Sequence, residues 1–315
     1  MSLNELKKRI DSTNKTAQIT KAMQMVSASK YNRMVQNSKN YDVYANKVKR
    51  MVAHVGKQQF DLLDNGMPIE DDLVNYVDFH DMLLTRPVKK VGYLIISSDK
   101  GLAGSYNSSV LRSVETMLKQ DHENPEEVVV LAIGEPIVRF CKENNYEVVH
   151  ELHHLSDSPS FTDVQKLVRT AVDLFKKQVF DALYVCYNHH LSPLAFQFRA
   201  DQILPVSELE LADAVDEIEA SNIQTEYLIE PDESAVLDRL LPQYAESQIY
   251  GAILDAKTTE HASRMNAMRS ATDNAADMIE DLQQQFHQMR QVKVTNEILE
   301  IINGANALDQ NKEGK

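Results

Sequence analysis

The chain has 315 residues, of which 43% are hydrophobic and 25% charged, with no Trp and a formal net charge of -14 at pH 7. Such values are typical of a globular chain of one or two domains. Because no apolar run approaches 18 residues and no charged-then-apolar leader is present, we expect neither a membrane span nor a signal peptide. Cys141 and Cys186 are too few and too apolar in setting for a disulfide framework or a zinc site, so a reducing cytoplasmic compartment is expected.

The prolines divide the chain into three regions, since all nine lie between Pro68 and Pro242. We predict four segments from this division: residues 1–57 as an N-terminal coiled-coil helix, 58–88 as a linker or surface insertion, 89–230 as an α/β domain, and 231–315 as a C-terminal coiled-coil helix and tail. The predicted fold class is α/β, with a long antiparallel coiled coil of the two terminal helices flanking a central Rossmann-like domain.

The N-terminal arm keeps a heptad pattern and should form one helix that ends at Gly56. Small and polar residues from Thr13 to Ser27 weaken the middle of its seam, so a second long helix is required as a partner. The seam positions are Leu3, Leu6, Ile10, Thr13, Ala17, Thr20, Gln24, Ser27, Tyr31, Met34, Ser38, Tyr41, Ala45, Val48, Val52 and Val55.

This arm is basic within an acidic chain. Up to Lys57 it carries twelve Lys or Arg against Glu5, Asp11 and Asp42, a balance of about +9, so the remainder carries about -23. A solvated helix face accounts for part of this charge, and basic helices can also bind nucleic acid. Aromatic stacking residues are sparse, however, and an acidic protein surface is the favoured target.

The centre alternates strand and helix patterns after an acidic, irregular stretch from Phe60 to Pro87. This alternation predicts a layered domain with a mainly parallel sheet. Expected strands are Val91–Ser98, Val128–Ile133, Glu147–Leu152 and Ala182–Tyr187, with Gln197–Leu204 and Thr225–Ile229 as further candidates. Expected helices are Ser108–Lys119, Pro136–Glu143 and Thr162–Phe180.

The C-terminal arm, from Ser247 to Leu308, should be a long helix, and Pro242 should break or kink the helix that Asp232 and Ser234 begin. Its register breaks after Met289, where we expect the N-terminal arm to stop accompanying it. The first stripe consists of Met265, Met268, Thr272, Ala275, Ile279, Leu282, Phe286 and Met289, and the second of Val294, Ile298, Ile301, Ala305 and Leu308.

One loop carries a hint of chemistry, because Ser98 to Ser105 follows the first strand, opens a helix and contains Gly101 and Gly104. Phosphates are often bound at such positions. The loop lacks both the dinucleotide glycine pattern and the P-loop lysine, so we expect no nucleotide and no other cofactor. The adjacent pairs His153/His154 and His189/His190 would point in opposite directions on a strand and make poor joint ligands.

Four ordered motifs resemble the gamma subunit of the rotary, F-type ATP synthase of bacteria, over nearly the whole chain. They are Ile19–Lys30, Ser98–Gly104 with Lys100 and Ala103 at positions where the family has Arg and Cys, Glu246–Tyr250 with Arg264–Ala275, and Val294–Glu300 with Gly304 and Ala305. The segment around Asn65 to Leu84 is longer than in many relatives.

The resemblance implies a non-catalytic rotor at the cytoplasmic face of the cell membrane. Its partners would be the alpha and beta subunits, which form the hexameric catalytic head, the epsilon subunit and the membrane c-ring. The chain would couple proton-driven rotation to ATP synthesis or hydrolysis at the beta subunits, and it would touch the membrane only through partners.

The resemblance also assigns residues by position, each of which has ordinary packing as its alternative interpretation. Positions that match the family's head interface are Met23, Arg264, Arg290, Gln291, Thr295 and Glu297, and those that match its foot are Tyr227 and Glu230. The basic arm adds Lys21 and Lys30 as head-interface candidates, and the apolar tip adds Ile298 and Ile302.

Two other classes stay open: a coiled-coil scaffold with a nucleotide-binding α/β domain, and a nucleotide-dependent α/β enzyme with helical arms. Co-purification with partner subunits separates them from a rotor.

Overall fold

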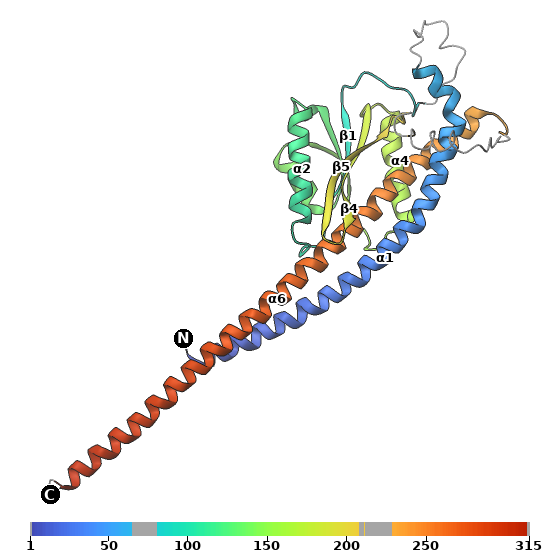
Figure 1. The fold of residues 1–315 in the computed structure, drawn as a ribbon. Helices are drawn as coiled ribbons and strands as arrows, with labels where there is room; N and C mark the ends of the chain where they lie inside the picture. Colours follow the sequence, from blue (N-terminus) through green and yellow to red (C-terminus); the bar gives the residue numbers. More distant parts are fainter. Residues whose placement is uncertain (1, 65–80, 208–210, 212–228, 314–315) are drawn as a thin grey trace. The chain divides into compact units, whose positions relative to one another are not determined.

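The computed structural model describes residues 2–64, 81–207, 211 and 229–313. Its elements, in chain order, are α1 (Leu3–Asp64), β1 (Val91–Ile96), α2 (Tyr106–Asp121), a 3-10 turn (Pro125–Glu127), β2 (Val128–Ile133), α3 (Glu135–Glu143), β3 (Glu147–Leu152), α4 (Phe161–Lys176), β4 (Ala182–Ser192), β5 (Ala195–Leu204) and α6 (Glu233–Glu313) (Figure 1).

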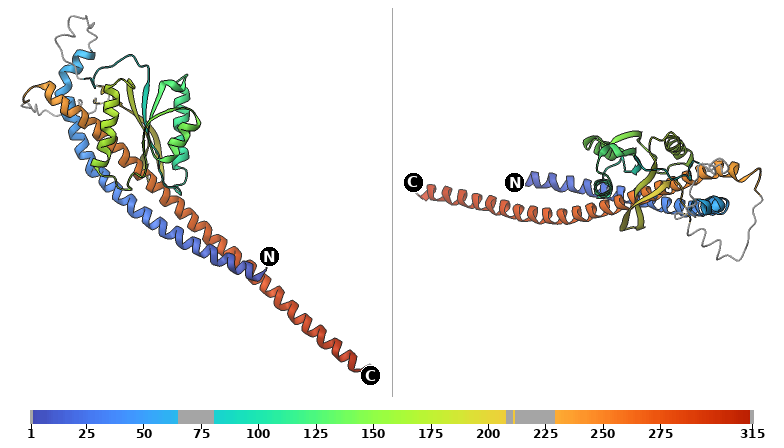
Figure 2. Two further views of the ribbon diagram at one scale, coloured as in Figure 1. Left: turned by 180° about the vertical axis from the view of Figure 1, so that it is seen from behind. Right: turned by 90° about the horizontal axis from the view of Figure 1, so that it is seen from above.

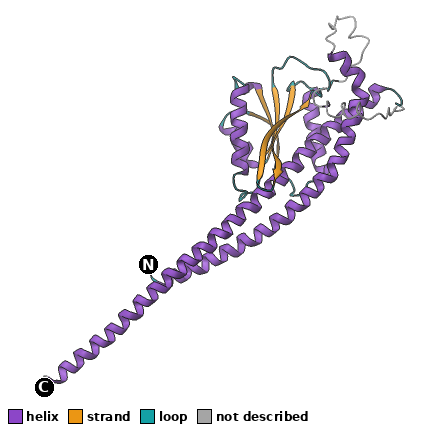
Figure 3. Cartoon of the chain, viewed as in Figure 1, coloured by secondary structure: helices purple, strands orange, loops and turns teal. Residues whose placement is uncertain are grey.

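The described strands, drawn in orange in Figure 3, form one five-stranded sheet. Their order in the sheet is β3-β2-β1-β4-β5. β1 is parallel to β2 and to β4, and β2 is parallel to β3. Among the strands that the structure describes, only the β4–β5 hairpin is antiparallel. Every residue of β1 and β2 is buried, as expected for central parallel strands covered on both faces. The α/β fold and the mainly parallel sheet that the sequence predicts are therefore confirmed.

Each face of the sheet carries its own apolar core, and α2 and α4 lie on opposite faces (Figures 1 and 2). α2 and α3 pack on one face, where Val110, Val114 and Ile137 are fully buried. α4 shares the other face with segments of α1 and α6, including Val52 and Leu241. The domain thus uses one face of its sheet to hold the two long helices.

The chain forms two compact units, residues 1–27 with 265–315 and residues 28–264, and α1 and α6 contribute to both. In the first unit the hydroxyl groups of Thr20 and Thr272 are 2.8 Å apart. In the second, Tyr41 donates to the carbonyl of Ser247 at 3.3 Å. Within each unit the helices run antiparallel (Figure 2). The four-segment division stays a prediction.

The heptad stripes are covered along the predicted seams. Every seam position of α1 from Leu3 to Val55 is buried or half-buried, and so is every seam position of α6 from Met265 to Met289. All residues from 290 to 303 are exposed, and α6 continues past the N terminus there (Figure 1). The register break at Met289 therefore marks the end of α1's cover, as predicted.

The predicted end of the N-terminal helix at Gly56 is wrong, because α1 continues to Asp64. A glycine costs a helix interior only about 1 kcal/mol, and the buried Val52, Ala53 and Val55 hold this turn in the core. Within the predicted segment 58–88, residues 58–64 are helical, and Met82 and Leu83 are buried in the same core. Residues 65–80 lie outside the described structure.

Other expected boundaries also differ, those of α4, β1 and β4 among them. α4 begins with a capping box of Ser160 and Asp163, and it ends at Lys176 rather than Phe180 because Gln178 adopts a left-handed φ of 58°. β1 ends at Ile96, two residues before Ser98, whereas β4 extends to Ser192 instead of Tyr187. The expected strand Thr225–Ile229 lies almost wholly outside the described residues.

Pro242 does not break its helix, since α6 is continuous from Glu233 to Glu313. A proline inside a helix costs about 3 kcal/mol, and the buried Leu237, Leu241 and Tyr244 around it compensate. The oxygen of Asp232 that accepts from the backbone N–H of Ala235 at 2.8 Å confirms its role as the start of the helix.

A glycine substitution tests the packing beneath β1. A Cβ added at Gly92 would lie 2.8 Å from Cγ of Phe180, a fully buried ring that has no room to move. We expect Gly92→Ala to lower the free energy of unfolding by about 1 to 3 kcal/mol, measured by urea denaturation of the isolated chain. Gly101→Ala is the matched control, because nothing lies within 4 Å of its added Cβ. Equal midpoints for the two variants would contradict this account.

Candidate functional site

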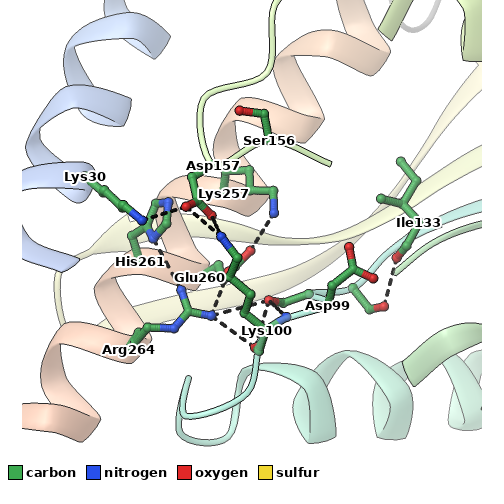
Figure 4. A network of polar contacts seen from close by, with 12 residues as sticks. Lys30, Asp99, Lys100, Ile133, Ser156, Asp157, Lys257, Glu260, His261 and Arg264 are labelled. Atoms are coloured by element: carbon green, nitrogen blue, oxygen red, sulfur yellow. Dashed lines mark hydrogen bonds and ion pairs between the residues drawn. The ribbon is translucent and has the colours of Figure 1, made fainter. Parts of the chain in front are cut away.

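A network of charged side chains joins the two long helices to the α/β domain (Figure 4). We call it the junction network. All of its members lie in the unit of residues 28–264. They are Lys30 of α1, Lys100 of the loop after β1, Asp157 of the loop after β3, and Lys257, Glu260 and Arg264 of α6.

The α6 part of the network is a buried ion triad. The carboxylate of Glu260 accepts from Lys257 at 2.9 Å and from Arg264 at 2.7 Å, and its side chain is only 2% exposed. The spacings of three and four residues place all three groups on one helix face. Burial by itself would raise the pKa of Glu260, but the charges of Lys257 and Arg264 outweigh it and lower that pKa. Glu260 therefore stays ionised.

Arg264 fastens α6 to the glycine loop. Its Nη2 donates to the carbonyl of Lys100 at 3.1 Å, and its Nε donates to the carbonyl of Gly101 at 3.3 Å. Only the rigid guanidinium fork offers several donors at fixed angles for such a set of acceptors. The loop thus turns its carbonyl oxygens toward α6.

Asp157 fastens α1 to the same loop. Its carboxylate accepts from Nζ of Lys30 at 2.6 Å and from Nζ of Lys100 at 2.8 Å. Burial opposes ionisation of Asp157, but the hydrogen bonds from Lys100 and Lys30 dominate and hold its pKa well below the usual range. Lys100 consequently connects to α1 through its side chain and to α6 through its backbone.

A second carboxylate occupies the place where a phosphate would be expected. Asp99 accepts from the backbone N–H of Glu135, the first residue of α3, at 3.0 Å, and from that of His154 at 2.7 Å. The loop follows β1 and leads into α2, as the sequence predicts, whereas the helix start that Asp99 binds is that of α3. Since Asp99 and the loop carbonyls are acceptors, they would repel a phosphate group, which argues against the nucleotide-binding alternatives.

The end of β4 is tied to α6 and α1 by further polar contacts. Asp255 of α6 pairs with Nδ1 of His189 and accepts from the backbone N–H of His190 at 3.0 Å. The ring of His190 lies 3.1 Å from the hydroxyl of Tyr31 on α1. His189 and His190 therefore bind different elements, as expected for neighbours on a strand. His153 and His154 lie beyond the end of β3, so the strand argument does not apply to them.

The structure brings together two of the predicted site residues, Lys30 and Arg264, in the junction network. Arg264 is 6% exposed and points into its own chain. On the first unit, Lys21 of α1 is exposed and Met23 is half-buried. Exposed positions near the end of α6 are Arg290, Gln291, Thr295, Glu297, Ile298 and Ile302. Glu230 is exposed just before α6, and Tyr227 lies outside the described residues.

Sequence reasoning missed Asp157, Lys257 and Glu260. Lys257, Glu260 and Arg264 stand at helical spacing, which is a usable pattern, but an exposed helix face shows the same spacing. The buried triad differs from an exposed helix face only in the loop after β1, which covers it. Asp157 carries no local pattern, because its partners lie far away in the chain.

The fold and the network together define a class of protein in which an α/β domain holds two long helices. Comparison with known proteins identifies the family. The family model described as ATP synthase matches residues 2–308. The ATP synthase gamma chain of Enterococcus hirae is 47% identical over 308 residues, covering 98% of this chain and 99% of that one. That of Lacticaseibacillus paracasei is 47% identical over 311 residues, with the same coverage of both chains.

The chain therefore belongs to the family of ATP synthase gamma chains, and the resemblance drawn from its motifs is confirmed. Solved structures agree on the fold. A chain of the Euglena gracilis mitochondrial ATP synthase, from its OSCP, F1 and c-ring structure, matches with a TM-score of 0.64 at 16% identity and covers 98% of this chain and 95% of that one. A chain of the central stalk and c-ring structure from Tetrahymena thermophila matches with a TM-score of 0.54 at 22% identity, covering 80% and 99%.

Replacing Arg264 tests the buried triad. Arg264→Met leaves Glu260 with one cation and two loop carbonyls without their donor, so the free energy of unfolding should fall by about 3 kcal/mol. Arg264→Lys keeps the charge, so its free energy of unfolding should fall by less. Thermal unfolding of the isolated chain measures both variants. A melting temperature of Arg264→Met equal to that of the wild type would contradict the account.

The same variant should change the response to acid. Because Glu260 has a lowered pKa when folded, its contribution is present above its ordinary value of 4.5 and is lost as the pH falls through the folded value. Without Arg264 the folded pKa rises, so the loss of stability as the pH falls from about 5 to 3 should be smaller than in the wild type. Melting temperatures of the two isolated chains over this pH range measure the difference, and equal falls would contradict the account.

Proposed function

We propose that this chain is the rotor of an ATP synthase, coupling proton-driven rotation of a membrane ring to ATP synthesis or hydrolysis at the beta subunits. Family membership supports this proposal. So does the relation to solved chains described as central stalk, rotor and c-ring assemblies. In this role the chain is not itself catalytic, and its partners are the alpha and beta subunits, the epsilon subunit and the c-ring.

The observation that carries the proposal is the bare end of α6. Large apolar side chains in the exposed stretch 290–303 are Val292, Val294, Ile298, Leu299, Ile301 and Ile302, each between 48% and 71% exposed. A fully exposed side chain of this kind forgoes roughly 1.5 to 3 kcal/mol of burial, and a contiguous apolar patch marks an interaction surface. At about 100° per residue these side chains cover roughly half of the helix circumference, which is wider than the seam that one neighbouring helix covers, so a sleeve of partner subunits fits them better than a single helix.

Rotation also requires a connection to the membrane. No helix in the described part of the chain has the length and hydropathy to cross a bilayer. The chain belongs to the head of a membrane-bound complex, and we place it at the cytoplasmic face of the cell membrane, held there peripherally by its partners. The proposed foot residues Tyr227 and Glu230 would face the ring.

Cysteine protection tests the sleeve. A cysteine at Ile302 should react readily with a maleimide in the isolated chain and become at least tenfold slower after assembly with alpha and beta subunits, because the tip is then covered. Background labelling is low, since Cys141 and Cys186 are buried. A cysteine at Val43, which is 60% exposed on α1 within the other unit, is the control and should react in both states. Equal reactivity of the Ile302 position before and after assembly would refute the sleeve.

The basic arm should contact acidic surface of the head. Lys21 is exposed and has no ion pair with any described residue, so Lys21→Glu should lower coupled ATP synthesis while leaving the melting temperature of the isolated chain unchanged. Lys30→Glu is the contrasting variant, because it also breaks the pair with Asp157 and should lower both. Proton-driven synthesis in membrane vesicles and thermal unfolding supply the two measurements. Normal synthesis by Lys21→Glu would remove this residue from the interface.

A further inference from the structure

The junction network lies where both long helices leave the unit that contains the α/β domain. The boundary between the compact units falls between Ser27 and Ala28 on α1 and between Arg264 and Met265 on α6. Lys30 and Arg264 therefore belong to the last turn of each helix within that unit. Both are connected to one loop residue, Lys100.

The polar contacts constrain the helices in a way that the apolar core does not. Burial of apolar surface is non-directional, so a smooth apolar seam resists separation better than it resists small rotations of a helix about its axis. Hydrogen bonds weaken steeply when their angle changes. A guanidinium bound to the carbonyls of Lys100 and Gly101 therefore fixes the rotational setting of α6 at this point.

The position along the helices matters as well. When a rod is held at one end and loaded beyond its support, the bending moment is greatest where it leaves the support. The contacts of Lys30 and Arg264 stand at this point on their helices, and the core contacts of Val48, Leu241 and Ile253 lie further inside the domain. The last contacts then decide how far each helix turns under a given load.

We propose that Lys100 is a positioning residue that sets the torsional stiffness with which the α/β domain passes rotation to α1 and α6. This inference rests on the proposed rotor function and adds a residue-level basis for it. The Nζ of Lys100 binds Asp157, which in turn binds Lys30 of α1 (Figure 4). The carbonyl of Lys100 accepts from Arg264 of α6. One loop thereby fixes the rotational setting of both helices relative to the α/β domain.

The α1 branch is separable from folding. The side chains of Lys100 and Lys30 are 61% and 40% exposed and that of Asp157 is 19% exposed, so these ion pairs should contribute less to stability than the triad around Glu260, whose side chains are 2% to 8% exposed. Asp157→Asn removes the anion that both lysines share, and Lys100→Met removes one cation while keeping the loop carbonyl. Lys100→Arg keeps the charge and should behave as the wild type.

The matched control is Glu147→Gln. Glu147 pairs with Lys90 at 3.2 Å, and Lys90 is 43% exposed, close to the 40% of Lys30. Both residues of this pair stand near the opposite end of the sheet, where β1 and β3 begin. This variant removes one carboxylate from the same domain without touching either long helix.

The test measures stiffness directly in a head reconstituted from alpha, beta and this chain. The head is fixed to a surface, a bead is attached to the α/β domain, and the angular variance of the bead is recorded without ATP. We expect Asp157→Asn and Lys100→Met to raise the variance about two-fold, the size that an ion pair of this exposure contributes to a local equilibrium. Lys100→Arg and Glu147→Gln should match the wild type. At about 1 M salt, where the Debye length is about 3 Å, the wild type should approach Asp157→Asn.

Several results would overturn the inference: equal variance in all variants, an equal increase in Glu147→Gln, or a melting temperature of the isolated Asp157→Asn chain that falls by as much as in Arg264→Met. The last result would assign Asp157 to folding alone. Adding ATP tests the rotor function separately, because a wild-type bead that does not rotate would refute the proposed function whatever the variances are.

Discussion

A long helix is stable in water only where its apolar stripe is covered, and this constraint organises the whole chain. α1 is covered from Leu3 to Val55, first by α6 alone and then by α6 together with the sheet. α6 is covered from Leu237 to Met289 and then left bare. The α/β domain supplies cover that two helices with many small and polar seam residues cannot supply to each other. Thr20 and Thr272 show the weakness of the seam, since they meet through a hydroxyl contact instead of apolar packing.

The fold follows from patterns that extend over many residues. Every heptad position identified from Leu3 to Val55 and from Met265 to Met289 is covered, and the alternation of β-rich and amphipathic segments identified a parallel sheet. Each of these patterns repeats often enough that a single exceptional residue does not hide it. Single residues were less reliable. Gly56 and Pro242 are unfavourable in a helix by about 1 and 3 kcal/mol, yet both lie inside one, since the buried residues next to them contribute more than those costs.

The junction network was only partly predictable for a different reason. Arg264 and Lys30 were identified as candidates, but Asp157 and Glu260 were not, because a charge in a sequence does not reveal whether a distant loop will cover it. Glu260 is ionised and 2% exposed only because Lys257, Arg264 and the loop after β1 all reach the same point. The glycine loop shows the reverse case. Its position at the carboxyl end of β1 was correctly inferred, but the direction of its carbonyl groups could not be read from Gly101 and Gly104.

The carboxyl edge of a parallel sheet is where α/β domains commonly bind their ligands, and in this chain the same edge binds helices. Asp99 holds the start of α3, Asp157 holds α1, and the loop carbonyls hold Arg264 of α6. The domain therefore uses the geometry of a ligand site with internal groups in place of a ligand. A bound nucleotide would come and go, whereas a side chain fixed to its own backbone is present in every state. For a chain that must carry torque between partners, a permanent attachment at this edge is the more suitable use of the fold.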